Sequence, residues 1–400
     1  MAQAAKSSLK FTILAECNTS LARTGVMNLP HHAVETPVFM PVGTQGTLKG
    51  ILPDQLEELG YQIILGNTYH LGMRPGPDLL KKAGGLHKFM GWDRALLTDS
   101  GGFQMVSLLK LAEITEDGVK FKSPYGADDC MLTPEESIRI QNAIGADIIM
   151  QLDDVVESTL SGPRVEESTY RTSRWLDRCL SAHERPDDQT IFPIVQGASD
   201  PDLRLISTRM HMEKDVKGFA LGGLSGGEAK SVFWKMVLVS TKILPKDKPR
   251  YIMGVGFATD IVICCALGAD MFDCVFPTRT ARFGCALTAS GQMNLRQKKY
   301  KFDFQPIDSE CECLTCKRHT RAYLNSIVTV QPTACHLLTI HNLYFQMSLM
   351  RSIRQSIKDQ RFPEFVRSYM NKAYPSGKFP HWILKSLRTV NIDLSSDSKS

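Results

Sequence analysis

Short apolar runs, each followed by a polar turn that is often rich in glycine, recur along the chain. We count eight of them. Strands buried on both faces of a parallel sheet show continuous apolar positions in place of strict alternation. The sequence therefore predicts eight buried strands, at residues 37–42, 62–65, 95–98, 147–152, 191–195, 218–221, 251–254 and 271–272.

Stretches with apolar residues at helical spacing separate most of these runs. Strands that alternate with helices indicate βα units, and eight such units fit a (β/α)₈ TIM barrel. In that fold the polar turns at the carboxyl ends of the strands form the functional face. A doubly wound open sheet ranks second, because no GxGxxG motif follows the first strand. The helical stretches are residues 134–144, 165–183, 201–213, 228–241 and 258–267.

Composition narrows the class of protein. With 43% hydrophobic and 22% charged residues among 400, the chain is not disordered or fibrous. Its longest unbroken apolar run, residues 261–267, is far shorter than the roughly 20 residues that span a bilayer. The first 17 residues lack both the apolar core of a signal peptide and an arginine-rich transit pattern. We expect a cytoplasmic protein without a transmembrane segment.

The net charge of +5 is small, but its placement is informative. Residues 278–321 hold nine Lys and Arg against four acidic residues, which accounts for the whole surplus. A local basic surface suits a phosphate backbone, although a solvated charged face explains it equally well.

Three of the eleven cysteines form a CxCxxC motif at Cys311, Cys313 and Cys316, and His341 follows within a helical stretch. Thiolates and imidazole are preferred zinc ligands, and four of them close a tetrahedral shell, so we predict one structural Zn²⁺. His319 and His336 compete with His341 for the fourth position on these grounds alone.

The chain thus divides into a barrel, a zinc-binding insertion after the last strand, and C-terminal helices near residues 332–358 and 361–373. We place the boundaries at 1–280 for the barrel, 105–133 for a hairpin insertion within it, 281–345 for the basic zinc subdomain, 346–393 for helices that complete the barrel, and 394–400 for a disordered tail.

Acidic residues follow several predicted strands directly: Asp99, Asp153, Asp154 and Asp273. A single such aspartate usually caps the next helix. Carboxylates from three strand ends that meet at one barrel mouth indicate instead a site where one acts as nucleophile and another as acid or base.

At these residues the chain resembles the tRNA-guanine transglycosylases, and in particular their eukaryotic catalytic chains. The resemblance covers about residues 10–380 in the family's motif order, which is more specific than any single motif. It rests on LLTDSGGFQ (96–104), MQLDD (150–154), VQG (195–197), GGLSGGE (222–228), MGVG (253–256), FDCVFPTR (272–279) and the CxCxxC motif with His341.

The resemblance implies a reaction and residue roles. Family members replace guanine at the anticodon wobble position by a 7-deazaguanine, through a covalent intermediate between an aspartate and the ribose. Carried over by motif, Asp273 would be the nucleophile and Asp99 the general acid/base. The substrate pocket would comprise Asp99, Ser100, Gly101, Gly102, Phe103, Asp153, Gln196, Gly223 and Gly226.

The resemblance also implies partners. The tRNA anticodon stem-loop would contact two segments, and eukaryotic members pair with a homologous non-catalytic subunit as a heterodimer. Peripheral association with the mitochondrial outer membrane is a further expectation from some eukaryotic members. The RNA-contacting residues would be Gly254, Val255, Gly256, Phe257, Ala258, Thr259, Asp260, Thr278, Arg279, Thr280, Ala281 and Arg282.

One position bears on which base is used. Bacterial relatives usually carry a valine where this chain has Gly226, and the missing side chain would leave room for the large substituent of queuine.

Two other functions are open. A non-catalytic scaffolding subunit would not need Asp99 and Asp273 in intact motifs, and a zinc hydrolase would need an open metal position that the four-ligand set does not leave.

Overall fold

Parallel strands form a closed barrel in the computed structural model, which describes residues 8–102, 113–122 and 129–394. The sheet order is β11-β10-β6-β5-β4-β15-β14-β13-β12. All eight predicted runs contain a strand, and the (β/α)₈ barrel prediction is confirmed. The strands are β4 (Val38–Gly43), β5 (Ile63–Gly66), β6 (Ala95–Thr98), β10 (Ile148–Met150), β11 (Thr190–Phe192), β12 (Ile194–Val195), β13 (Phe219–Leu221), β14 (Arg250–Ile252) and β15 (Met271–Cys274).

The predicted run 191–195 closes the barrel because it pairs with a strand on each side. Its first half, β11, pairs with β10, and its second half, β12, pairs with β13. Pro193 separates the halves and has no N–H, but its carbonyl accepts a hydrogen bond from Ala220 N at 2.8 Å. The Gln151 side-chain oxygen accepts one from Ile194 N at 2.9 Å. The sheet therefore has no exposed edge at this position.

Successive residues of the strands alternate between two hydrophobic clusters. Val38 and Met40 belong to the cluster inside the barrel, whereas Phe39 packs outward among the helices. The inner cluster also contains Met27 and Val34, which come from an antiparallel N-terminal sheet that the sequence patterns did not predict. That sheet closes the amino-terminal end of the barrel and consists of β1 (Lys10–Glu16), β2 (Arg23–Asn28) and β3 (Ala33–Thr36).

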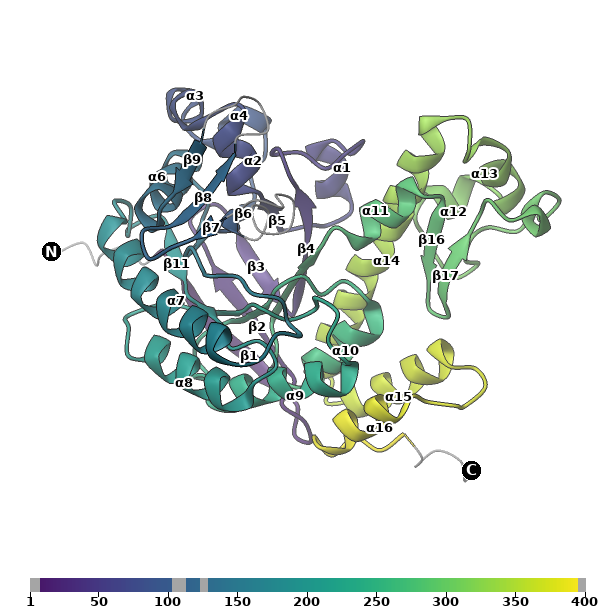
Figure 1. Cartoon of the computed structure of the whole chain (residues 1–400). Coiled ribbons are helices and arrows are strands. Elements are labelled where there is room, and N and C mark those ends of the chain that lie inside the picture. Colours follow the sequence, from purple (N-terminus) through teal and green to yellow (C-terminus); the bar gives the residue numbers. More distant parts are fainter. Residues whose placement is uncertain (1–7, 103–112, 123–128, 395–400) are drawn as a thin grey trace, which may run out of the picture.

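Helices surround the barrel (Figure 1). The five helical stretches predicted between strands correspond to α6 to α10. Thr133 caps α6 by accepting a hydrogen bond from Glu136 N at 3.1 Å, and Gly145 ends it in the left-handed conformation. The helices of this region are α1 (Pro53–Glu58), α2 (Thr68–Met73), α3 (Pro77–Ala83), α4 (Leu86–Met90), α6 (Pro134–Ile144), α7 (Pro163–Ala182), α8 (Pro201–Met212), α9 (Lys230–Thr241) and α10 (Ala258–Ala266).

The insertion after β6 contains three antiparallel strands: β7 (Glu113–Ile114), β8 (Val119–Lys122) and β9 (Asp129–Leu132). The turn of the β7–β8 hairpin is closed by a hydrogen bond from Thr115 N to the Gly118 carbonyl at 3.0 Å. Helix α7 holds this turn through Arg174 Nε, 2.8 Å from a Glu116 carboxylate oxygen. The hairpin lies within residues 105–133, of which 105–112 and 123–128 are outside the described residues.

Beyond the barrel, a lobe lies to one side and carries the cysteine motif (Figure 1). Helix α14 extends from this lobe along the barrel, where it contacts β4 and the N-terminal sheet. The boundary predicted between residues 345 and 346 falls inside α14, because one continuous helix belongs to both the lobe and the barrel wall. The remaining elements are α11 (Phe276–Arg282), β16 (Cys285–Thr288), β17 (Gly291–Asn294), η1 (Lys298–Tyr300), α12 (Leu314–Arg318), α13 (Arg321–Ile327), α14 (Pro332–Lys358), α15 (Phe362–Ala373) and α16 (His381–Arg388).

None of the helices in the described ranges combines the length and the hydropathy that a bilayer-spanning segment needs. The predicted tail falls almost entirely at residues 395–400, outside the described residues.

Candidate functional site

The carboxyl ends of the barrel strands bring the predicted aspartates to one mouth. Asp99 follows β6 and is buried, and the loop after β5 holds both of its oxygens. Oδ1 accepts hydrogen bonds from Thr68 N at 2.9 Å and Gly101 N at 3.2 Å, and Oδ2 accepts one from Asn67 Nδ2 at 2.6 Å. Donors from main chain and side chain therefore fix the orientation of this carboxylate.

Asp153, after β10, is bound between two other predicted pocket residues. Ser100 Oγ donates to its Oδ1 at 3.0 Å, and Gln196 Nε2 donates to its Oδ2 at 2.7 Å. Burial is the main reason why the pKa of Asp153 rises to about 6, and the negative charge of Asp154 adds to it. The oxygen of the Gln196 amide, Oε1, is buried and has no hydrogen-bond partner among the described residues.

Asp154 lies next in sequence but serves another purpose. Its carboxylate accepts hydrogen bonds from Arg164 Nη1 at 2.8 Å and Arg171 Nη1 at 2.6 Å, both on α7. These ion pairs hold the loop after β10 against that helix. The structure thus separates the two neighbours: Asp153 is available at the mouth and Asp154 is structural.

Asp273 lies in β15 and is half-buried. Its Oδ1 accepts hydrogen bonds from Tyr251 Oη at 2.6 Å and from Gly254 N at 2.7 Å. Within the described ranges Oδ2 accepts no hydrogen bond. Burial raises the pKa of the Asp273 carboxyl despite these two bonds. One oxygen is therefore held in place while the other has its lone pairs available, which suits a nucleophile.

Tyr251 connects the two carboxylates electrostatically. It is buried inside the barrel, and burial followed by the charge of Asp273 raises the pKa of its phenol well above the usual value. The charge of Asp99 raises it further. The tyrosine therefore stays protonated and can donate to Asp273 at any physiological pH.

Two glycine positions after β13 lie beside this network. Gly223 has φ of +65°, and a Cβ there would lie 2.3 Å from Gln196 Oε1, so the loop can approach the amide only because the residue is glycine. At Gly226 a Cβ would lie 2.9 Å from Ser158 Oγ. The space left by the absent side chain thus borders Ser158. Gly101 and Gly102 lie in the loop after β6, and Phe103 is outside the described residues.

The two predicted RNA-contacting segments flank the mouth but differ in exposure. Gly254, Phe257 and Arg279 are exposed, and the Phe257 ring packs against Phe276 with centroids 4.3 Å apart. Asp260 is buried and pairs with Lys230. Half-buried and buried positions are not available to a ligand to the same extent. The half-buried residues are Ala258, Thr259, Thr280 and Arg282, and the buried ones are Val255, Gly256, Asp260, Thr278 and Ala281.

A second cluster, in the lobe, could hold a metal ion. Its ligand atoms all lie within 4.8 Å of one another, and they belong to Cys311, Cys313, Cys316 and His341. His341 Nδ1 is 3.7, 3.5 and 3.3 Å from the three sulfurs in that order. Zinc bond lengths in a tetrahedral shell require an S···N separation of about 3.6 Å. The donor set therefore fits such an ion without rearrangement.

The surroundings identify the fourth ligand and fix its ring. His341 Nε2 lies 2.8 Å from the Leu287 carbonyl, a partner that leaves Nδ1 free to bind the metal. The two competing histidines lie elsewhere. His319 stacks on Tyr323 with ring centroids 4.9 Å apart, and His336 contacts the Gly50 carbonyl.

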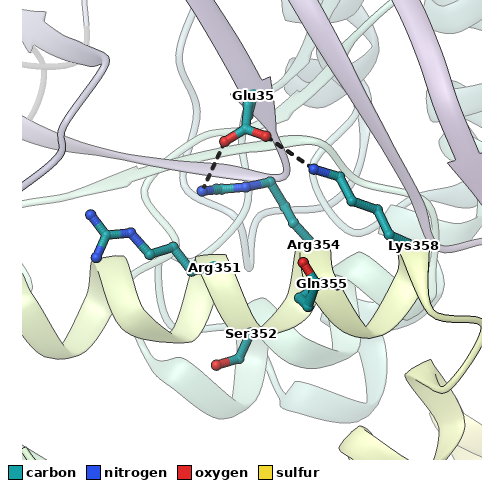
Figure 2. Close-up of a pocket in the computed structure, with 6 residues that line it drawn as sticks. All are labelled: Glu35, Arg351, Ser352, Arg354, Gln355 and Lys358. Carbon is teal, nitrogen blue, oxygen red and sulfur yellow. Dashed lines mark hydrogen bonds and ion pairs between the residues drawn. The ribbon is translucent and has the colours of Figure 1, made fainter.

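A surface depression on α14 is not part of the mouth. Figure 2 shows Arg354 and Lys358 directed at Glu35 of β3. Lys358 Nζ lies 3.1 Å from a Glu35 oxygen, and Arg354 Nη1 donates to the Pro37 carbonyl at 2.9 Å. Because β3 and Pro37 precede β4, this depression is at the amino-terminal end of the barrel, opposite the aspartates.

Sequence reasoning missed the residues that orient the carboxylates. Tyr251 belongs to an apolar run, so its hydroxyl gave no separate signal. Asn67 and Thr68 come one residue after the predicted strand 62–65, in the polar turn that follows it, and the strand-end argument that selected the aspartates would also have pointed to them.

A (β/α)₈ barrel with converging carboxylates at its mouth and a separate Cys₃His cluster is the arrangement of a barrel enzyme that carries a metal-binding lobe. A family profile described as queuine tRNA-ribosyltransferase matches residues 17–375, and with it the chain belongs to that family. Its relatives carry the same name.

Three relatives illustrate the similarity. The queuine tRNA-ribosyltransferase catalytic subunit of Schizosaccharomyces pombe is 53% identical over 96% of this chain and 98% of its own length. That of Caenorhabditis elegans is 53% identical over 92% of this chain and 91% of its own. The queuine tRNA-ribosyltransferase of Bacillus subtilis is 46% identical over 92% and 97%.

Proposed function

We propose that this chain is the catalytic subunit of a tRNA-guanine transglycosylase that exchanges guanine at the anticodon wobble position of tRNA for queuine. The observation that carries the proposal is the environment of Asp273. Tyr251 and Gly254 fix one oxygen, and the other faces no donor within the described ranges. A scaffolding subunit has no need of this arrangement, which supports the catalytic role.

The proposed reaction is a double displacement. Asp273 Oδ2 attacks C1′ of the ribose, an ester bond forms, and the bond from C1′ to the base nitrogen breaks with its electron pair leaving on guanine. A proton then neutralises the departing base, with Asp99 as the acid/base group at the mouth. The incoming base loses its proton to the same group and attacks C1′, which releases Asp273. One glycosidic bond replaces another, so no energy-rich cofactor is needed.

Base recognition follows from the donors and acceptors at the mouth. The Asp153 carboxylate can accept from the ring N–H and the exocyclic amine of a guanine-like base, whereas a Gly223 N–H can donate to its carbonyl. Gln196 fixes the Asp153 carboxylate by its 2.7 Å hydrogen bond. A base that lacks these groups would leave buried partners unpaired, at a cost of about 1–3 kcal/mol for each group.

The RNA would be held outside the pocket. An unpaired wobble guanine in an anticodon loop can leave its stack at modest cost, and the exposed Phe257 ring offers a stacking surface. Arg279, exposed on α11, can position a phosphate. We further propose a homologous non-catalytic chain as heterodimeric partner, with cytoplasmic location and peripheral attachment to the mitochondrial outer membrane.

We assign zinc to the Cys₃His cluster. Four protein ligands complete its shell, so the ion would be structural and would leave no position for water or substrate. Bound there, it would join α12 to α14. No step of the exchange involves it.

The exchange reaction itself tests the proposal. The chain, alone and with its proposed partner, is incubated with an anticodon stem-loop RNA and radiolabelled guanine, and the label in RNA is counted. We expect incorporation by the wild type and a loss of at least a thousandfold in Asp273→Asn. Asp154→Asn serves as a control for the loss of a nearby aspartate outside the reaction. Absence of incorporation under every pairing, despite RNA binding, would indicate a scaffolding subunit.

A further inference from the structure

A buried cation lies directly behind the two loops that carry Gln196 and Gly223. Arg204, near the start of α8, is fully buried, and no acidic side chain of the described residues forms an ion pair with it. Burying a charge is costly unless hydrogen bonds compensate it. Here main-chain oxygens of the two loops provide these hydrogen bonds. A loop arrangement that withdrew them would leave the buried charge uncompensated, so the charge favours the observed arrangement.

The guanidinium binds both loops at once. Arg204 Nε donates to the Ala198 carbonyl at 2.8 Å, and Nη1 lies 3.5 Å from the Val195 carbonyl. Nη2 donates to the Gly222 carbonyl at 2.8 Å and lies 3.4 Å from that of Gly223. The first pair flanks Gln196, and the second carries the Gly223 peptide. The rigid, planar guanidinium thereby fixes the position of the Gln196 loop relative to the Gly223 peptide.

The bond to Gly222 also determines where the Gly223 N–H points. The Gly222 carbonyl and the Gly223 N–H belong to one trans peptide, in which they point in opposite directions. Because the carbonyl faces Arg204, the N–H faces away from it. A cation on the carbonyl oxygen polarises the peptide, and this strengthens the N–H as a donor.

The charge persists at neutral pH. Burial lowers the pKa of Arg204 to about 9, and the Glu228 carboxylate opposes the shift. At pH 7 the guanidinium is therefore protonated and able to polarise the peptide.

We infer that Arg204 is a positioning residue that tunes the mouth for a base with a carbonyl group on the edge that meets Gly223. It does not touch the base but acts through the Gly222–Gly223 peptide and the loop of Gln196. The inference rests on the proposed function, since it assumes that these two loops bind the base.

The test compares guanine with 2-aminopurine, which lacks the carbonyl oxygen and with it the ring N1–H that Asp153 would accept from. Dissociation constants for both bases are measured by calorimetry for wild type and Arg204→Lys. The loss at Asp153 is the same in wild type and variant, so the effect of the substitution on the ratio of the two constants reports the carbonyl. The matched control is Arg250→Lys, since Arg250 is also buried and donates to the Leu244 and Gly268 carbonyls at the other end of the barrel. RNA affinity and thermal unfolding are recorded for each.

We expect Arg204→Lys to weaken guanine binding about tenfold to a hundredfold and 2-aminopurine binding less than threefold, with RNA affinity unchanged. In Arg250→Lys the ratio of the two constants stays at the wild-type value. Equal weakening of both bases, or no weakening of either, overturns the inference. A wild type that incorporates no guanine into RNA defeats the proposed function instead.

Should the lysine variant fail to fold, wild-type protein labelled with ¹⁵N-arginine gives the same test without a substitution. The shielded Arg204 guanidinium protons exchange slowly with water. Bound guanine should shift their signals, whereas bound 2-aminopurine should not. Signals that respond identically to both bases, or to neither, overturn the inference.

Discussion

At the scale of single residues, neighbours decide what each carboxylate can do. Asp153 and Asp154 are adjacent in sequence, yet Asp154 binds two arginines of α7 while Asp153 receives Ser100 and Gln196. Strand-end position alone could not separate them, because it says nothing about which side of the loop each side chain takes. Arg164 and Arg171 are ordinary surface-helix residues in the sequence, so their pairing with Asp154 depends on how α7 packs.

The raised pKa of Asp153 predicts how base affinity depends on pH. The carboxylate must be ionised to accept from the base, and its pKa is about 6. Affinity for guanine should therefore be constant above this pH and fall by about tenfold per unit below it, as the carboxyl takes up a proton. Calorimetry between pH 5 and 8 measures this. RNA affinity without the base is the control, and a guanine affinity that stays flat down to pH 5 would contradict the assignment.

Gly226 predicts a selective effect on the larger base. In Gly226→Val the new side chain would meet Ser158 and occupy the space beside it, since a Cβ already lies 2.9 Å from Ser158 Oγ. We expect the KM for queuine to rise at least tenfold while guanine exchange changes less than threefold. Steady-state kinetics with both bases measure this. Gly226→Ala is the smaller control, and equal losses for the two bases would refute the idea.

At the scale of elements, the apolar runs located every barrel strand because each is buried on both faces. The N-terminal sheet was missed, since β1 alternates between exposed and half-buried positions and packs only one face on the barrel. The continuity of α14 was also missed. Its residues satisfy two environments in turn, the metal lobe and the barrel wall, and helical periodicity does not reveal such a change.

The dual role of α14 predicts the consequence of losing the metal. Cys313→Ser removes one of four ligands, so bound zinc should fall from one ion per chain to well below one. Hydrogen exchange should then increase in residues 285–327, while guanine binding at the mouth changes less than threefold. Metal analysis and exchange mass spectrometry measure both. The control is Cys335→Ser, a cysteine outside the cluster. Full metal content in Cys313→Ser would exclude the assigned site.

At the scale of the whole molecule, three separate features meet at one end of the barrel. The carboxylates of Asp99, Asp153 and Asp273 lie at the mouth, an exposed aromatic ring and an arginine flank it, and the metal lobe is connected to it through α11. The fold and the aspartates could be predicted from runs and motifs, since both are local in sequence. Tyr251 and Arg204 could not, because their effect depends on contacts across the barrel.

The central claim is that Asp273 forms a bond to the ribose, and one measurement addresses it directly. Wild-type chain with its partner is mixed with stem-loop RNA and a slowly reacting base, denatured, digested and analysed by mass spectrometry. We predict a ribonucleotide attached to the peptide that contains Asp273, absent in Asp273→Asn and present in Asp154→Asn. An adduct on any other residue, or base exchange that proceeds without an adduct in the wild type, would contradict the account.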